Sequence, residues 1–209
     1  MKSELVEKIK TYYDDKLKAH GPTAQGVDWK NEETQVIRFS LLAKLFGGQT
    51  HFNVNDMGCG YGAFADYLLT SQIPFDTYYG YDISDEMIRA SKKKFEKSAN
   101  CVFIKSGTPQ KSDFTVSSGI LNVKLDTPLE EWANVVEGLL ETMCAASTAG
   151  FSFNMLNQPT AESYRREHLF YGDSSHYEQL CKDKFGAKVN VYRNEHLYEF
   201  TVVVTDLYK

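Results

Sequence analysis

The sequence has few of the residues that bind structural metals or anchor proteins in membranes. Its 209 residues include four cysteines, which stand far apart and form no CxxC pair or Cys/His cluster, so no metal site is expected. No stretch reaches the roughly 18 consecutive apolar residues of a membrane span, and the polar start does not resemble a signal peptide. We therefore expect reduced thiols, no membrane partner and a cytoplasmic location.

The chain also lacks an excess of positive charge, because 28 Asp and Glu outnumber 23 Lys and Arg and give a net charge of −5. Proteins that bind a phosphate backbone are usually basic, so nucleic acid is disfavoured as a partner. The length suits one domain of ordinary globular composition. We expect a helical cap over residues 1–48 and a Rossmann-like core over 49–209; the oligomeric state is left open.

Hydrophobic periodicity predicts two helices before residue 48, followed by strands that alternate with helices. Thr127 is predicted to cap a later helix with Pro128 in its first position. Tyr198 is predicted to lie in the core. Two final strands share a turn too short for a parallel return, so they pair antiparallel. The pattern predicts an α/β fold with a mostly parallel, doubly wound sheet that ends in a C-terminal antiparallel β-hairpin. The expected strands are 51–57, 77–82, 101–105, 114–118, 150–155, 188–192 and 196–204.

A glycine-rich turn follows the first predicted strand, with Gly58, Gly60 and Gly62 at alternate positions. Glycine permits unusual backbone angles and lets a ligand approach the chain closely. Asp82 ends the second predicted strand, 20 residues beyond Gly62, where a carboxylate can accept hydrogen bonds from ribose hydroxyls. This order of strand, glycine turn, helix, strand and acid predicts a ligand that contains a nucleoside.

Three features favour a nucleoside that bears an amino acid over a dinucleotide. Asp56 stands two residues before Gly58, where its carboxylate would repel a pyrophosphate and attract an ammonium group. The C-terminal hairpin is foreign to a purely parallel nicotinamide-binding domain. About 50 residues precede the first sheet strand, and none remain for a separate substrate domain.

The segment Asp56–Gly62 resembles the glycine motif of class I S-adenosylmethionine-dependent methyltransferases, and Asp82 matches their ribose-binding acid. The resemblance covers residues 50–205 and implies a seven-stranded sheet with S-adenosyl-L-methionine as cofactor. It places Asp56 near the methionine end and Ser118 in the segment 117–122 that lines the sulfonium and the acceptor. Many members carry an adenine-binding acid where this chain has Ser106-Gly107-Thr108. The implied cofactor-binding residues are Asp56, Gly58, Cys59, Gly60, Gly62, Asp82, Ile83 and Ser118.

The N-terminal segment is similar to a subgroup of small, poorly characterised bacterial methyltransferases, through Gly26–Trp29 and Gln35–Phe39. That likeness implies N-terminal helices that cover the cofactor, with Arg38 reaching its carboxylate. The alternative for Arg38 is an ordinary surface residue. Trp29 is either a lid aromatic or part of the core.

Methyl transfer from a sulfonium is an in-line displacement that needs mainly proximity and alignment, worth roughly 7–11 kcal/mol. Acceptor contacts are expected within residues 154–176, including the polar and aromatic stretch Ser163–Tyr171. His168 and His176 are candidate catalytic bases, with ordinary surface histidines as the alternative. Arg165 and Arg166 either bind an anionic substrate or form a solvated basic pair.

The predicted function is methyl transfer to a small-molecule acceptor. Three alternatives stay open: a protein or nucleic-acid acceptor, a cofactor-binding protein without catalysis, and a nicotinamide oxidoreductase. Against a flipped-base substrate, Ser117-Ser118-Gly119-Ile120 stands where an Asn/Asp-Pro-Pro-Tyr/Phe motif would follow the fourth strand.

Overall fold

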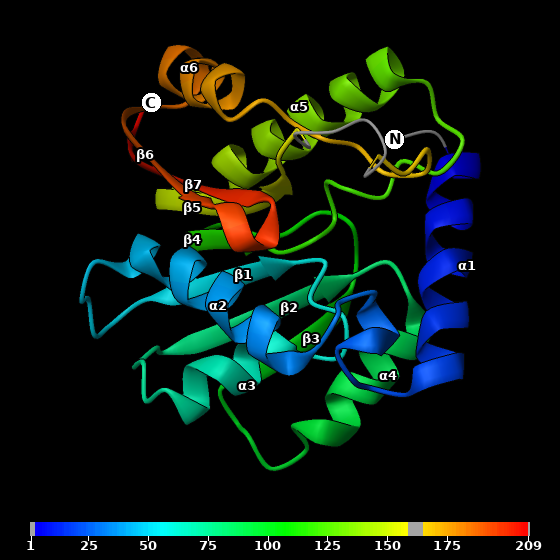
Figure 1. Cartoon of the computed structure of the whole chain (residues 1–209). Coiled ribbons are helices and arrows are strands. Elements are labelled where there is room, and N and C mark those ends of the chain that lie inside the picture. The colour runs from blue at the N-terminus through cyan, green and yellow to red at the C-terminus, as the bar shows by residue number, and fades with distance from the viewer. Residues whose placement is uncertain (1–2, 159–164, 209) are drawn as a thin grey trace.

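A computed structural model describes residues 3–158 and 165–208 of the chain. The centre of the described molecule is a seven-stranded sheet with the strand order β3-β2-β1-β4-β5-β7-β6 (Figure 1). Its strands are β1 (Asn53–Met57), β2 (Thr77–Asp82), β3 (Cys101–Lys105), β4 (Ser112–Ser117), β5 (Ser147–Leu156), β6 (Gly186–Asn194) and β7 (Glu199–Leu207).

The sheet is parallel from β3 through β5 and antiparallel at β7 and β6. This confirms the predicted fold class, including the C-terminal hairpin. The chain runs outward from β1 to β2 and β3, and then returns to β4 on the other side of β1. The order therefore reverses between β1 and β4, which is where open α/β sheets bind their ligands.

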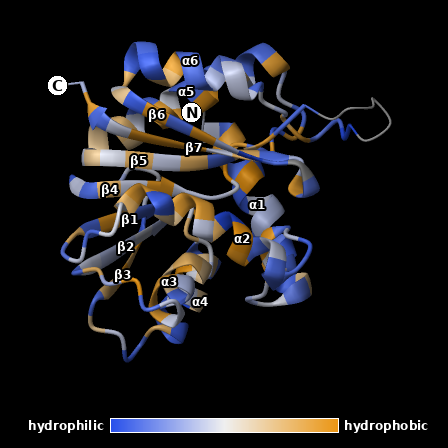
Figure 2. Cartoon of the chain, turned by 60° about the vertical axis from the view of Figure 1, so that its left-hand side comes forward, coloured by the Kyte–Doolittle hydropathy of each residue, from blue (hydrophilic) through white to orange (hydrophobic). Residues whose placement is uncertain are grey.

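Helices cover both faces of the sheet. Successive residues of a strand point to opposite faces, so each strand can pack against both layers of helices. Phe151 and Phe153 of β5 pack on the face covered by α5 and α6, whereas Ser152 donates a hydrogen bond to the Leu42 carbonyl on the other face. Figure 2 shows α5 and α6 on one side of the sheet and α3 and α4 on the other. The helices are α1 (Ser3–His20), α2 (Glu32–Leu42), α3 (Ala63–Thr70), α4 (Asp85–Lys94), α5 (Leu129–Ala146) and α6 (Ser174–Lys184), with short 3-10 turns at Gln25–Val27, Ala43–Phe46 and Glu195–Leu197.

The two N-terminal helices occupy different places. Phe39 and Leu42 of α2 belong to the core cluster on the sheet face that α3 also covers. By contrast, α1 runs across the edge where the parallel strands end (Figure 1). Leu5 of α1 packs in the cluster beneath α5, and the Ser84 hydroxyl donates a hydrogen bond to Asp14. The first helix therefore covers the ligand-binding end of the sheet.

Two local predictions were wrong. Helix α5 begins at Leu129 with Pro128 at the cap position and no side-chain cap hydrogen bond. The preceding Thr127 instead closes a turn, in which its N–H donates to the Lys124 carbonyl. Tyr198 is 55% exposed rather than buried, since it lies in the turn before β7, where its φ is 50°.

Candidate functional site

The glycine turn after β1 is fixed to the neighbouring strand by main-chain hydrogen bonds. The N–H groups of Gly58 and Cys59 both donate to the Tyr81 carbonyl on β2, over 2.8 and 2.9 Å. Gly58, Gly60 and Gly62 have φ values of 80°, 54° and 85°, which are positive angles that favour glycine. These main-chain hydrogen bonds and positive φ angles therefore help to hold the turn in one shape.

The three glycines have different neighbours. A Cβ atom on Gly58 would lie 2.1 Å from Cγ2 of Ile120, and one on Gly60 would lie 3.1 Å from Cγ1 of Val27. Both neighbours line the central cavity, so these glycines keep its floor open. A Cβ on Gly62 would instead meet the ring of Phe95 at 2.6 Å, in the hydrophobic core. Gly62 thus allows close packing of the helix that follows.

Asp82 lies beside this turn at the end of β2. Its Oδ2 accepts a hydrogen bond from the Gly60 N–H at 3.0 Å, and its Oδ1 accepts one from the Ser84 N–H at 2.9 Å. Burial raises the pKa of the Asp82 carboxyl, while these two N–H donors oppose the rise. The carboxylate is therefore oriented by main-chain groups, and its free lone pairs can accept further donors.

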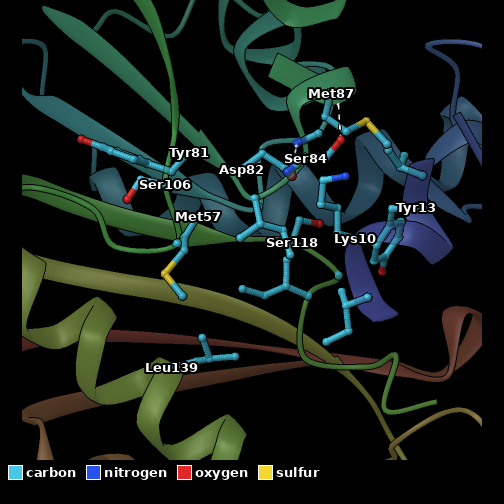
Figure 3. Close-up of a pocket in the computed structure, with 18 of the residues that line it drawn as sticks. Lys10, Tyr13, Met57, Tyr81, Asp82, Ser84, Met87, Ser106, Ser118 and Leu139 are labelled. Atoms are coloured by element: carbon cyan, nitrogen blue, oxygen red, sulfur yellow. Dashed lines mark hydrogen bonds between the residues drawn. The ribbon is translucent and has the colours of Figure 1, made fainter. Parts of the chain in front are cut away.

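Asp82 and the glycine turn line a cavity at the point where the strand order reverses. Figure 3 shows side chains from β2, α1 and α5 converging on the cavity, including Asp82, Tyr13 and Leu139. Predicted residues that line it are Gly58, Gly60, Asp82, Ile83 and Ser118; unpredicted ones include Ile9, Lys10, Tyr13, Met87, Trp132 and Leu139.

A smaller hollow adjoins the cavity and shares Gly58, Gly60 and Ser118 with it. The predicted residues Asp56 and Cys59 line this hollow. Burial raises the pKa of Asp56 to about 7, although a 2.5 Å hydrogen bond donated by the Tyr78 hydroxyl opposes the rise. Burial also raises the pKa of the Cys59 thiol, so Cys59 is no thiolate nucleophile.

Gln35 of α2 also lines the smaller hollow and is buried. Its Oε1 accepts a hydrogen bond from the Tyr61 hydroxyl at 3.3 Å. Its amide nitrogen has no hydrogen-bond partner among the residues that the structure describes. The hollow therefore combines an acid with an available amide donor.

Arg38, one turn further along α2, is engaged elsewhere. Its Nε and Nη2 donate to the two carboxylate oxygens of Glu199 over 2.6 and 2.8 Å, and its Nη1 donates to the Thr34 carbonyl. Both charged side chains are buried. Arg38 lines neither hollow, so its contact with a cofactor carboxylate stays a prediction.

Trp29 contacts both Arg38 and the segment that follows β4. The Arg38 guanidinium stacks on its ring, 4.1 Å from the centroid. A Cβ on Gly119 would lie 2.8 Å from Cζ2 of the indole, which shows how closely Trp29 packs on the segment after β4. Asn154 anchors that segment, because its Oδ1 accepts from the Gly119 N–H and its Nδ2 donates to the Ser118 hydroxyl.

Ser106 and Gly107, at the end of β3, line the cavity where an adenine-binding acid was missing from the sequence. The Ser106 hydroxyl donates to the Thr108 carbonyl and accepts from the Thr108 N–H, so its hydrogen bonds are satisfied locally. The main-chain groups of this turn are therefore the ones available to a ligand in the cavity.

The two candidate histidines lie apart. His168 lines an open hollow beside Trp29, whereas His176 is exposed on α6 and contacts the ring of Tyr177. Arg166 lines the same hollow as His168, and Arg165 stacks over the ring of Tyr171. Ser163 and Tyr164 lie outside the described residues.

Within residues 3–158 and 165–208, no three His, Cys, Asp or Glu side chains gather as metal ligands would. No helix in this part of the chain has the length and apolar character to cross a membrane.

Comparison with known proteins gives the fold and the motif a family context. Residues 55–121 match the family model described as a methyltransferase domain. A Mycobacterium tuberculosis protein named provisionally as a methyltransferase, Rv1506c, is 41% identical over 154 residues, which cover 73% of this chain and 92% of that protein.

Two solved structures share the fold at low sequence identity. Magnesium protoporphyrin IX methyltransferase from Synechocystis, with bound S-adenosylhomocysteine, aligns with a TM-score of 0.68 and 16% identity, over 98% of this chain and all of that one. Phosphoethanolamine N-methyltransferase 1 from Haemonchus contortus aligns with a TM-score of 0.67 and 13% identity, over 98% of this chain and 50% of that one.

Proposed function

This chain belongs to the class I S-adenosylmethionine-dependent methyltransferases, and from that premise we propose that it methylates a small-molecule acceptor at the cavity beside Asp82. The observation that carries the proposal is the Asp82 carboxylate, which two main-chain N–H groups hold at the edge of a cavity floored by glycine. The same cavity extends past Ser118 to Trp29, where a second molecule can approach.

The cavity fits the cofactor of this family. Gly58 and Gly60 leave main chain in place of side chains on the floor, so the nucleoside and its sulfur can lie close to the turn. We assign Asp82 to the ribose hydroxyls and the main chain of Ser106 and Gly107 to the adenine. Ile83 and Met87 supply apolar surface beside these positions.

We assign the methionine end of the cofactor to the smaller hollow. Asp56 supplies the anion for the ammonium group, which in turn favours the ionised form of this buried carboxyl. Gln35 supplies its available amide N–H to the carboxylate. We prefer Gln35 to Arg38 for this contact, because Glu199 and Thr34 already bind the guanidinium.

Bound S-adenosylmethionine supplies an electrophilic methyl group on a positively charged sulfur. The chain's own contribution is alignment and exclusion of water. Met57, Ile120 and Trp132 line the cavity with apolar surface, and α1 covers it from the open side. Of the two candidate bases, His168 has the better position to take a proton from an acceptor, because the hollow it lines shares Trp29 with the cavity.

Calorimetric titration with S-adenosylmethionine, S-adenosylhomocysteine and NAD tests the cofactor assignment, using protein stripped of bound ligand. Wild type should bind the first two and not NAD. Asp82→Asn should weaken binding about 10- to 100-fold, because an amide nitrogen cannot accept the hydrogen bonds that the carboxylate accepts. The matched control is Asp85→Asn, an exposed acid in the next helix, which should bind within about twofold of wild type. Failure of wild type to bind either nucleoside contradicts the proposal.

A second measurement tests the acceptor class. The protein and methyl-labelled S-adenosylmethionine are incubated with a cell extract separated into small molecules, proteins and nucleic acids. We expect label in the small-molecule fraction. Label confined to protein or nucleic acid would favour a macromolecular acceptor, and cofactor binding without label in any fraction would favour a protein that binds without catalysis.

A further inference from the structure

An open hollow lies beside the cofactor cavity and has a different character. It is formed by one side of α1, the turn that leads into Trp29 and the segment that precedes α6. We call it the basic groove, and its lining residues are Tyr12, Lys16, His20, Gln25, Asp28, Trp29, Lys30, Arg166, His168 and Leu169.

The charges of the basic groove are predominantly positive. Three permanent cations, Lys16, Lys30 and Arg166, face a single lining carboxylate, Asp28. Asp28 is already occupied, since it pairs with Lys16 at 2.6 Å and accepts a hydrogen bond from the Tyr12 hydroxyl. Lys30 and Arg166 are exposed and have no ion-pair partner among the described residues. The groove therefore keeps two uncompensated cations in a chain whose net charge is −5.

The segment that carries Arg166 and His168 is held by main-chain hydrogen bonds. The His168 carbonyl accepts from the N–H groups of Lys124 and Leu125, and the Phe170 N–H donates to the Asn122 carbonyl. The Arg166 N–H donates to the Tyr171 hydroxyl. The groove wall is consequently connected to the segment after β4, which also lines the cofactor cavity.

Trp29 is the wall that the groove and the cofactor cavity share. The Arg38 guanidinium stacks on its indole, and the Gly119 backbone packs closely against the same ring, so Trp29 is held in place by both contacts. The groove thus combines the exposed cations Lys30 and Arg166 with the partly buried side chains of Trp29 and Leu169.

We propose that the basic groove binds the methyl acceptor through an anionic group, so that the acceptor is a small organic carboxylate or phosphate whose apolar part packs on Trp29. Lys30 and Arg166 bind the anion, and Trp29 orients the rest of the molecule toward the cofactor. The inference rests on the proposed function, and it adds the charge of the acceptor and the residues that select it.

The test uses simple probes in place of the unidentified acceptor. Phenyl phosphate, benzoate and the neutral isostere benzamide are titrated calorimetrically at low ionic strength into protein saturated with S-adenosylhomocysteine. At least one of the two anions should bind at a single site, and benzamide should bind at least about fivefold more weakly. The relative affinities of phenyl phosphate and benzoate distinguish a phosphate from a carboxylate acceptor.

Variants locate the binding site. Lys30→Gln and Arg166→Gln should each raise the dissociation constant of the anion about fivefold, and the double variant should raise it further. The matched control is Lys93→Gln, an exposed lysine on α4, which should leave the dissociation constant within about twofold of wild type. Equal binding of anion and benzamide, no saturable anion binding, or equal losses in Lys93→Gln and the groove variants would overturn the proposal.

Failure of this inference and failure of the proposed function have different signatures. Affinity for S-adenosylhomocysteine is measured first in wild type and in every variant, and the groove variants should keep it within about twofold. If wild type does not bind the nucleoside, the proposed function fails, and the anion titrations are then repeated on ligand-free protein. If the nucleoside binds and the anions do not, only the groove assignment fails.

Discussion

The cofactor cavity and the basic groove share Trp29 but are built in different ways. The floor of the cavity is main chain, fixed by the bonds of Gly58 to β2 and of Asp82 to Gly60. The groove is lined by side chains, several of them exposed, from segments more than 130 residues apart, such as Lys30 and Arg166. A main-chain floor specifies one ligand shape, whereas exposed side chains can change without disturbing the sheet. If the two proposals hold, the cofactor site depends on the fold, whereas the acceptor site depends on surface side chains.

The largest expected effect comes from the ion pair that supports the shared wall. Glu199→Ala leaves the Arg38 guanidinium buried without its partner, and we expect a loss of about 3–5 kcal/mol in the free energy of unfolding. Denaturant titration measures it. The cofactor cavity and the basic groove should then both bind their ligands more weakly, because Arg38, which stacks on Trp29, loses the partner that holds it.

The control for this variant is Glu178→Ala, which removes partly exposed ion pairs to Lys182 and Arg193 and should cost less than about 1 kcal/mol. A loss in Glu199→Ala as small as that of the control would show that the buried pair does not support this region.

The next largest effect should separate the cavity from the groove. Gly58→Ala places a Cβ 2.1 Å from Ile120 at a φ of 80°, so Ile120, which lines the cavity, must shift. We expect affinity for S-adenosylhomocysteine to fall about 30- to 100-fold, with anion binding in the groove within about twofold of wild type. Gly138→Ala on α5, where a Cβ meets open space, should leave both affinities unchanged. Equal losses at both sites would contradict the separation.

Acidity should affect the cavity through Asp56. With its pKa at about 7, this carboxyl is protonated below that pH and cannot pair with the ammonium group. Affinity for S-adenosylhomocysteine should therefore rise by about tenfold between pH 6 and pH 8, and Asp56→Asn should flatten the profile. A wild-type profile as flat as that of Asp56→Asn would remove Asp56 from the ammonium site.

In the ligand-free protein, the same shift in the Asp56 pKa makes the folded state less stable as the pH rises. The unfolded chain releases this proton near pH 4 and the folded chain near pH 7, so the folded state binds more protons between these values. The free energy of unfolding should therefore fall as pH rises through this window, less steeply in Asp56→Asn. Denaturant titrations across the window measure the contribution of Asp56.

The smallest expected effect tests whether the cofactor cavity and the basic groove are coupled through Trp29. Trp29→Leu removes the stacking on Arg38, which is worth about 0.5–1 kcal/mol. We expect both S-adenosylhomocysteine and the anion probe to bind about two- to fivefold more weakly, while Trp29→Phe recovers most of the loss. Calorimetry on the two variants measures this. A change confined to one ligand would mean that Trp29 serves only one of the two hollows.

The sequence by itself determined the fold class, the glycine turn and the place of Asp82 beside it. These features are local: alternation identifies strands, a short turn makes the last two antiparallel, and positive φ angles require Gly58 and Gly60. Asp82 could be predicted because its strand neighbours β1 and ends at the same edge of the sheet.

The tertiary structure alone decided which residues surround the cofactor cavity and the basic groove. Arg38 pairs with Glu199, 161 positions away, and no local pattern in the sequence indicates that ion pair. Lys10 and Tyr13 line the cavity because α1 lies across the strand ends, and His168 reaches the groove while His176 does not. Local patterns determine which residues form a helix or strand, but contacts between distant segments depend on how those elements pack, and side chains at such contacts leave no periodic signal in the sequence.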